Sequence, residues 1–257
     1  MTIIRILCMG VVTLLFTFPV DAQSEKTEKE EKNKVVLMGM IHRGHKTSEK
    51  YDLDKIKTLI RDIKPDYVFC EIPPDRVEEA NRQYKEQGKI TESRVKVFPE
   101  YVDALYPLTK ELEFEIVPCA GWTKPMADAR RAKLAELKTS QKTEYEEMTA
   151  AQEKATKSIG EAGGNDNPAY IHTDEFDAFV KAGMGPYNRH FNDILGPGGW
   201  ENINKAHYGL IDKNLDSRTG QGKTILIMFG SWHKYWFKEQ LKKRDDITLV
   251  NLNKYLK

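Results

Sequence analysis

Short apolar runs alternate along this chain with longer stretches in which apolar residues recur at helical spacing. Residues 35–38 and 67–70 are apolar runs bounded by polar or breaking residues, as expected for strands buried on both faces of a sheet. Between them, residues 53–63 have the spacing of an amphipathic helix. A strand, a helix and a second strand in this order favour a β-α-β unit with parallel strands. The pattern therefore predicts an α/β fold with a central mixed, mainly parallel sheet flanked by helices.

The remainder of the chain continues this alternation. Strands are predicted at 114–117, in the apolar run that begins at residue 224, and at 247–252. The pattern predicts helices over 75–87, 101–112, 176–194, 202–215 and 232–243, and it interrupts the third of these at the Gly-Met-Gly-Pro sequence of residues 183–186.

A charged helical insertion is predicted at about residues 126–160. This stretch is rich in Ala, Lys, Glu and Gln, which are strong helix formers, and its apolar residues are sparse. The composition predicts one long helix or a helical hairpin that stands partly away from the core. Such helices most often present solvated faces. The position of the insertion between the third strand and the last apolar run also allows a lid over a site.

The N-terminus has the pattern of a secretory signal over residues 1–22. Arg5 precedes an apolar run at 6–18, and Val-Asp-Ala at 20–22 precedes the expected cleavage point. The apolar run is short for a membrane span. We therefore expect an exported protein, periplasmic or secreted, that keeps no stable membrane span after cleavage. Residues 23–34 are nearly all charged and are predicted to form a solvated linker to a single α/β domain over 35–257.

Charge and cysteine content limit the classes of partner. The chain has 40 basic and 39 acidic residues and a formal net charge of +1, which gives no reason to expect nucleic acid or an anionic membrane as a partner. A small-molecule or peptide substrate fits better. Cys70 and Cys119 each end a predicted strand, so a disulfide between neighbouring strand ends is conceivable in an exported protein. The favoured interpretation is two small buried residues without a bridge.

Two segments about 190 residues apart have the same local pattern, an apolar run followed by Gly-x-x-His. The first contains Gly39 and His42, and the second contains Gly230 and His233. Glu71 stands directly after another predicted strand. Open α/β sheets place their ligands at the carboxyl ends of the strands. The two histidines and Glu71 are therefore expected to meet at one edge of the sheet.

These three side chains allow more than one chemistry. Two imidazoles and a carboxylate are a common ligand set for a catalytic divalent metal, so His42, Glu71 and His233 are candidate metal ligands. The same residues also work without metal if a histidine is the general base and Glu71 orients it. A third interpretation is structural, with histidines that only cap the strands.

Several other residues are candidates for substrate contacts. His45 is a candidate second ligand or substrate contact, although a loop does not fix the geometry of a His-x-x-His pair. Arg76, five residues after Glu71, is placed either to hold a substrate anion and orient Glu71, or on the surface. Arg189 and His190 are candidate substrate-binding residues. The remaining histidines, His172 and His207, are interpreted as structural or surface residues.

The paired Gly-x-x-His motifs resemble the two signatures of the TraB/PrgY/GumN and TIKI-like group, within the erythromycin esterase/ChaN-like superfamily. Residues 64–76, KPDYVFCEIPPDR, are similar to a stretch of that group which supplies a Glu and an Arg, here Glu71 and Arg76. The resemblance runs from about residue 34 to the end of the chain. It implies a mixed α/β fold and a site of His42, Glu71, Arg76 and His233, often with a metal-dependent hydrolase or esterase-like activity.

The chain also departs from that group. Gly-Trp-Thr at 121–123 stands where an Asp-Arg pair is expected, and the charged insertion belongs to this chain alone. The leading hypothesis is an exported hydrolase, metal-dependent, that cleaves an ester, lactone or peptide bond. The alternative is a non-catalytic protein of ChaN-like type that binds haem, a metal or a small ligand through the same histidines.

Overall fold

A parallel five-stranded sheet forms the centre of the molecule. The computed structural model describes residues 31–256, so the predicted signal peptide lies outside the described residues. The strand order is β3-β2-β4-β1-β5, and every pair is parallel. The predicted α/β fold is confirmed, and the sheet is parallel throughout rather than mixed. The strands are β1 (Asn33–Met40), β2 (Tyr67–Cys70), β3 (Glu115–Pro118), β4 (Thr224–Gly230) and β5 (Ile247–Val250).

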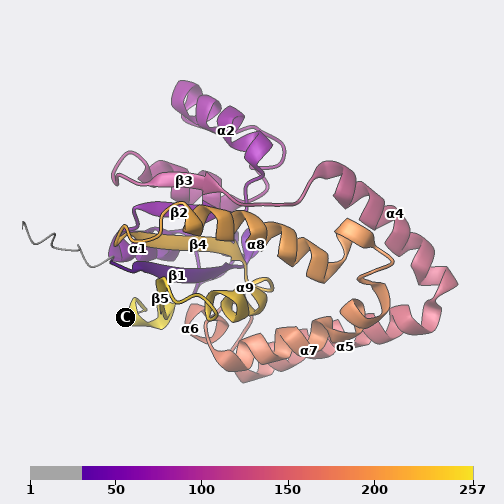
Figure 1. Ribbon diagram of the computed structural model, residues 1–257. Helices are drawn as coiled ribbons and strands as arrows, with labels where there is room; N and C mark the ends of the chain where they lie inside the picture. Colours follow the sequence, from indigo (N-terminus) through magenta and orange to yellow (C-terminus); the bar gives the residue numbers. More distant parts are fainter. Residues whose placement is uncertain (1–30, 257) are drawn as a thin grey trace, which may run out of the picture.

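Helices cover both faces of this sheet (Figure 1). The longer helices are α1 (Leu53–Ile63), α2 (Pro74–Gln87), α4 (Lys124–Ser140), α5 (Lys142–Ala162), α7 (Asp174–Phe191), α8 (Trp200–Asp216) and α9 (Lys234–Leu241). The short ones are η1 (His42–Lys46), the π-helix η2 (Glu100–Leu105), α3 (Tyr106–Leu108), α6 (Pro168–Ile171), η3 (Gly196–Gly198) and η4 (Leu252–Lys254). None of the helices in residues 31–256 combines the length and the apolar composition that crossing a membrane requires.

The central strands are buried on both faces because their side chains alternate between two cores. In β1, Val36 and Met38 belong to the larger core, which includes the apolar stripe of α1. Val35 and Leu37 belong to the second core, under α8 and α9. This double burial explains why the strands appear in the sequence as nearly continuous apolar runs.

Three details of the predicted elements differ from the structure. The predicted linker extends to residue 34, but β1 begins at Asn33, whose buried amide bonds with the backbone of Arg218 and Lys223. The helix predicted over 101–112 is replaced by the π-helix η2 and the short α3. The interruption predicted at residues 183–186 is absent from α7, which is continuous with Pro186 inside it.

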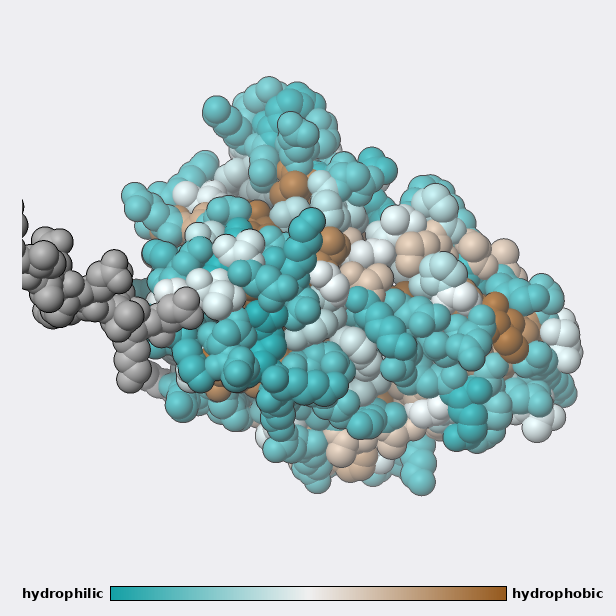
Figure 2. All heavy atoms as spheres, viewed as in Figure 1, coloured by the Kyte–Doolittle hydropathy of each residue, from teal (hydrophilic) through white to brown (hydrophobic). Residues whose placement is uncertain are grey.

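The insertion is a helical hairpin formed by α4 and α5, which reverses at Gln141. In Figure 1 it extends, together with α7, beyond the end of the sheet at which the strands finish. The helices α5 and α7 approach closely at Gly183. A Cβ at this position would lie only 2.6 Å from Ala155 Cβ, so a residue with a side chain would hold the two helices further apart. This close contact explains why a glycine in the middle of α7 does not break the helix. Hydrophilic residues dominate the face seen in Figure 2.

Candidate functional site

The two Gly-x-x-His motifs lie on neighbouring strands in register. Met40 on β1 pairs with Gly230 on β4, and Ser231 N–H donates a 2.8 Å hydrogen bond to Met40 O. Both glycines are still within their strands. A Cβ on Gly39 would lie 3.0 Å from Ser231 Cα, and one on Gly230 would lie 2.7 Å from His42 Nε2. The glycines therefore allow close approach of the two motifs.

His42 is held in an unusual backbone conformation by a buried carboxylate. Its φ of 50° lies in the left-handed region, which non-glycine residues rarely adopt; the other such residue among those described, Lys64, caps the end of α1. Its Nδ1 donates a 2.7 Å hydrogen bond to Glu100 Oε1, and Glu100 is fully buried. Burial acts to lower the pKa of His42, but the Glu100 hydrogen bond and the charges of Glu71 and Glu100 outweigh it and raise the pKa to about 9. His42 is therefore an imidazolium at neutral pH.

Glu71 faces the other ring nitrogen of His42. Its Oε2 lies 3.9 Å from His42 Nε2 and accepts a 2.9 Å hydrogen bond from Gly230 N–H. The backbone N–H of Glu71 donates to Tyr101 Oη, which in turn donates to Met228 O, so the strand end is fixed to β4. Burial raises the pKa of the Glu71 carboxyl, against the lowering effects of His42 and the Gly230 N–H.

His233 has a neutral partner in place of a carboxylate. Its Nδ1 donates a 2.7 Å hydrogen bond to Asn204 Oδ1, and Asn204 Nδ2 donates to Trp200 O, which fixes the orientation of the amide. Trp200 stacks on the imidazole with ring centroids 4.4 Å apart, and Phe237 lies parallel to it at 5.9 Å. Burial, followed by the charges of His207 and His42, lowers the pKa of His233 well below its usual value. The ring is therefore neutral, with a lone pair on Nε2.

His207 also reaches this cluster. Among the described residues, Glu71, His207 and His233 each offer one ligand-type atom, and these atoms lie within 4.8 Å of one another. His207 Nδ1, however, accepts a 2.9 Å hydrogen bond from Gly121 N–H, and burial lowers the pKa of His207 to about 4. The neutral ring then carries its proton on Nε2, which makes that nitrogen a hydrogen-bond donor. His42 is not part of this group: it approaches Glu71 to 3.9 Å, and as an imidazolium it carries a proton on Nε2 as well. Glu71 and His233 are therefore the two predicted ligands that the structure brings together in this group, and His233 keeps Nδ1 hydrogen-bonded and Nε2 open.

A hollow of about 300 Å³ opens on the two motif histidines. The two motif segments form most of its wall. Asn165, in the loop after α5, and Phe176, on α7, complete the lining. The return of the insertion thus borders the hollow, while His42 is 36% and Glu71 15% exposed at the side chain. A small ligand in the hollow can contact His42 and His233, whereas Glu71 is not part of its lining.

His45 and His172 hold the first motif through its backbone. Ile41 N–H donates to His45 Nε2 at 3.0 Å, and Gly39 N–H donates to His172 Nε2 at 2.9 Å. Their Nδ1 atoms bond to the carbonyls of Tyr51 and Pro168. Burial lowers the pKa of both rings, that of His172 to about 3. With both nitrogens occupied, His45 is placed as a backbone clamp, whereas the sequence indicated a ligand or substrate contact.

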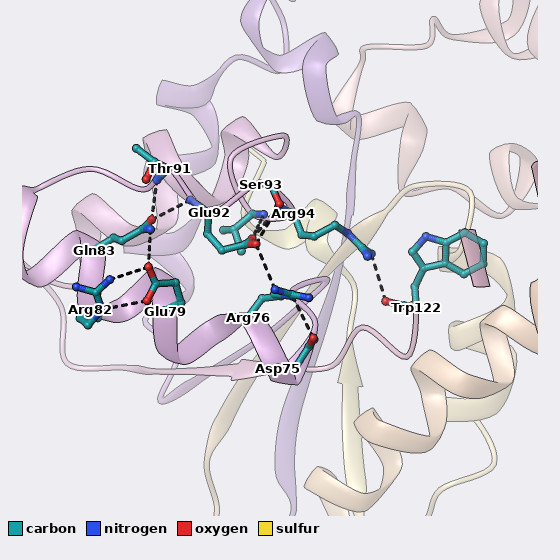
Figure 3. A network of polar contacts seen from close by, with 11 residues as sticks. Asp75, Arg76, Glu79, Arg82, Gln83, Thr91, Glu92, Ser93, Arg94 and Trp122 are labelled. Atoms are coloured by element: carbon teal, nitrogen blue, oxygen red, sulfur yellow. Dashed lines mark hydrogen bonds and ion pairs between the residues drawn. The ribbon is translucent and has the colours of Figure 1, made fainter. Parts of the chain in front are cut away.

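Arg76 lies in a network of charges at the start of α2 (Figure 3). Its Nε is 3.0 Å from Asp75 Oδ2, and an Nη atom is 4.0 Å from Glu92 Oε1. The side chain is 42% exposed. The structure thus agrees with the surface alternative that the sequence left open for Arg76, and its ion pairs are with Asp75 and Glu92 and not with Glu71.

Arg189 and His190 both contact Glu147 on the insertion. Arg189 forms an ion pair with this carboxylate, and His190 Nε2 lies 2.7 Å from its second oxygen. These contacts attach the end of α7 to α5 and do not involve the motif histidines. Cys70 and Cys119 are free and buried, and burial raises the pKa of both thiols.

Sequence reasoning missed three residues that shape the site, namely Glu100, Asn204 and His207. Glu100 lies in a charged stretch before a predicted helix, and only the π-helix turns both Glu100 and Tyr101 inward. Asn204 and His207 are three residues apart on α8 and share its buried face, which was a usable signal for His207. Comparison with known protein families, with curated proteins and with solved structures found no match for this chain.

Proposed function

We propose that this protein is a hydrolase whose reaction takes place between His42, Glu71 and His233. One observation carries the proposal. Two imidazoles from different strands, each with Nδ1 held by a buried partner, lie on either side of Gly230 beside the Glu71 carboxylate. Rings held in this way by a partner on Nδ1 are typical of metal ligands and of acid-base groups, whereas a histidine that only caps a strand does not need such a partner.

Glu71 and His233 would hold a divalent cation, since each offers an atom with a lone pair, and His42, 3.9 Å from Glu71, would be the third ligand. A cation held there would polarise a carbonyl group and make a water molecule nucleophilic near neutral pH. The proton on His42 Nε2 would have to leave before that nitrogen binds a cation, so cation affinity falls as the pH drops.

The residues themselves supply acid-base chemistry. Hydrolysis takes a proton from water and delivers one to the leaving group. Glu71, whose raised pKa makes it a stronger base than an ordinary carboxylate, takes the proton from water. The His42 imidazolium, 3.9 Å away, donates a proton to the leaving group. Glu100 keeps His42 in the orientation that this transfer needs.

The substrate class proposed is an ester, lactone or peptide of small size, in keeping with the hollow of about 300 Å³. The proposal includes the resemblance to the erythromycin esterase/ChaN-like superfamily and export through the N-terminal signal pattern. Uptake of haem or another small ligand without turnover is the competing outcome of the test below.

Elemental analysis of the purified chain, with an esterase and peptidase screen with and without Zn²⁺, Mn²⁺ and Co²⁺, tests the proposal. We expect turnover with at least one substrate class and its loss in His233→Ala. The matched control is His190→Ala, because His190 lies outside the site; this variant should keep the turnover of wild type. Equal turnover and cation content in wild type and His233→Ala would contradict the proposal, and a haem Soret band without turnover would favour the binding protein.

A further inference from the structure

Arg130, on the helical insertion, is held in a fixed position that the proposed reaction leaves unused. Its Nε donates a 2.9 Å hydrogen bond to Tyr187 Oη. The guanidinium carbon lies 5.6 Å from the centre of the Tyr187 ring and 5.9 Å from that of Trp122. A Cβ on Gly198 would be 2.9 Å from Arg130 Cβ, so the glycine allows α4 to pack on η3. Three contacts thus define the orientation of one side chain.

The guanidinium has no acidic partner among residues 31–256. Its neighbour Arg131 pairs with Asp128 and is 81% exposed. Arg130 is part-buried, and its only hydrogen bond among the described residues uses Nε. The two Nη groups therefore present a free edge, which is the edge that binds carboxylate or phosphate in a bidentate manner. A half-buried arginine whose orientation is fixed in this way is pre-organised for an anion.

Two chain segments connect Arg130 to the proposed site. Residues 198–200 contact Arg130 at Gly198, and Trp200 at their other end stacks on His233. The segment at 121–122 supplies the Trp122 ring, and its Gly121 N–H bonds to His207, which meets His233 edge-on at 5.1 Å. The positive charge of Arg130 is also among the smaller causes, after burial, that lower the pKa of His233.

The backbone of Trp122 is held by a hydrogen bond from Arg94. Arg94 donates a 3.2 Å hydrogen bond to Trp122 O, and Figure 3 shows the indole extending away from the Arg76–Glu92 network. The ring is thereby available to Arg130 on its face. The insertion thus adds a cation that is connected to the site through the neighbours of His233, namely Trp200 and His207.

We propose that Arg130 binds a carboxylate or phosphate group of the substrate, so that the site accepts anionic molecules in preference to neutral ones. The choice of substrate rests on the proposed hydrolase function, whereas anion binding at Arg130 does not. In this arrangement the ends of the sheet strands supply the reacting groups, and Arg130 on α4 of the insertion binds the anionic group of the substrate.

Binding of inorganic phosphate and of glutarate to the metal-free full chain tests the proposal without turnover. Calorimetry gives the affinity, and the change in tryptophan fluorescence that is lost in Trp122→Phe reports occupancy beside Trp122. We expect saturable binding of at least one anion, weakened about 10–100-fold in Arg130→Gln, as expected for a charge-assisted pair. Arg131→Gln, one residue along the same helix, is expected to bind like wild type. The tighter of the two anions identifies the group that the site prefers.

Two further variants separate anion binding from packing. Arg130→Lys keeps the charge without the bidentate edge, and Tyr187→Phe removes only the orienting hydroxyl; both are expected to weaken binding less than Arg130→Gln. Absence of saturable binding in wild type, or equal binding in Arg130→Gln and Arg131→Gln, would overturn the proposal. If an esterase is found, the ratio of kcat/KM for anionic over uncharged esters should fall in Arg130→Gln. Anion binding without any turnover would contradict only the hydrolase function.

Discussion

The two Gly-x-x-His motifs have the same local sequence pattern and opposite electrostatic surroundings. His42 has a carboxylate on Nδ1 and a second carboxylate beyond Nε2, and its pKa is raised to about 9. His233 has an amide on Nδ1 and aromatic rings on its faces, and its pKa is lowered. Side by side at one sheet edge, they form one cationic and one neutral imidazole. The difference shows that the residues around a motif, which lie far away in sequence, decide its chemistry.

Glu100→Gln would break this contrast most strongly. The amide keeps the shape of the side chain and removes the charge, so burial is less opposed and the pKa of His42 should fall below its wild-type value. Loss of such an orienting partner typically costs about 10–100-fold in activity or metal affinity. NMR titration of His42 and steady-state kinetics measure both effects. Glu92→Gln, at another largely buried carboxylate, is the control; an unchanged pKa of His42 in Glu100→Gln would be inconsistent with the proposed pairing.

Asn204→Asp would give the second motif the partner of the first. A carboxylate on Nδ1 favours the imidazolium, so the pKa of His233 should rise above its wild-type value. Imidazole ¹⁵N shifts at several pH values measure it. A His233 that stays neutral down to acidic pH in this variant would mean that burial, and not the partner, decides its state.

Acid should destabilise the first motif through its histidine clamps. The folded pKa of His172 is about 3 and that of His45 is lowered, while unfolded histidine titrates near 6.5. The unfolded state therefore binds more protons below pH 6.5, and stability falls as pH drops from 6.5 toward 3, by up to about 1.4 kcal/mol per pH unit for each group. His207 and His233 act in the same direction. Urea unfolding of wild type and His172→Gln at pH 6.5 and 4.5 should show a smaller loss in the variant; equal losses would disprove the clamp.

The smallest effects are expected for Arg76, Arg189 and His190. Their close ion pairs are with the exposed or half-exposed Asp75 and Glu147, and the buried Glu92 lies 4.0 Å from Arg76. Exposed ion pairs contribute about 0–1 kcal/mol. Single alanine variants should therefore keep the cation content, and KM should stay within about twofold of wild type. A KM increase of tenfold or more in Arg76→Ala would restore the role that the sequence indicated for it.

Much of the fold can be predicted from the local sequence pattern. The bounds of β2 and α1 illustrate this, because the spacing of their buried residues marks both elements in the sequence. His42, Glu71 and His233 also follow, since strands of one parallel sheet end at the same edge. Glu100 and Arg130 do not follow, because a π-helical turn brings in the first and the packing of the insertion brings in the second. Nothing in a charged stretch distinguishes the one inward-facing residue from its solvated neighbours.

A calorimetric titration of the metal-free chain with Zn²⁺ tests the central claim most directly, that the two unlike histidines and Glu71 form one site. The account predicts one ion per chain, with release of about one proton at pH 7.5 because His42 must lose its proton on binding. Binding should be lost in His233→Ala and unaffected in His190→Ala. Absence of saturable binding in wild type, or equal affinity in His233→Ala, would contradict the account.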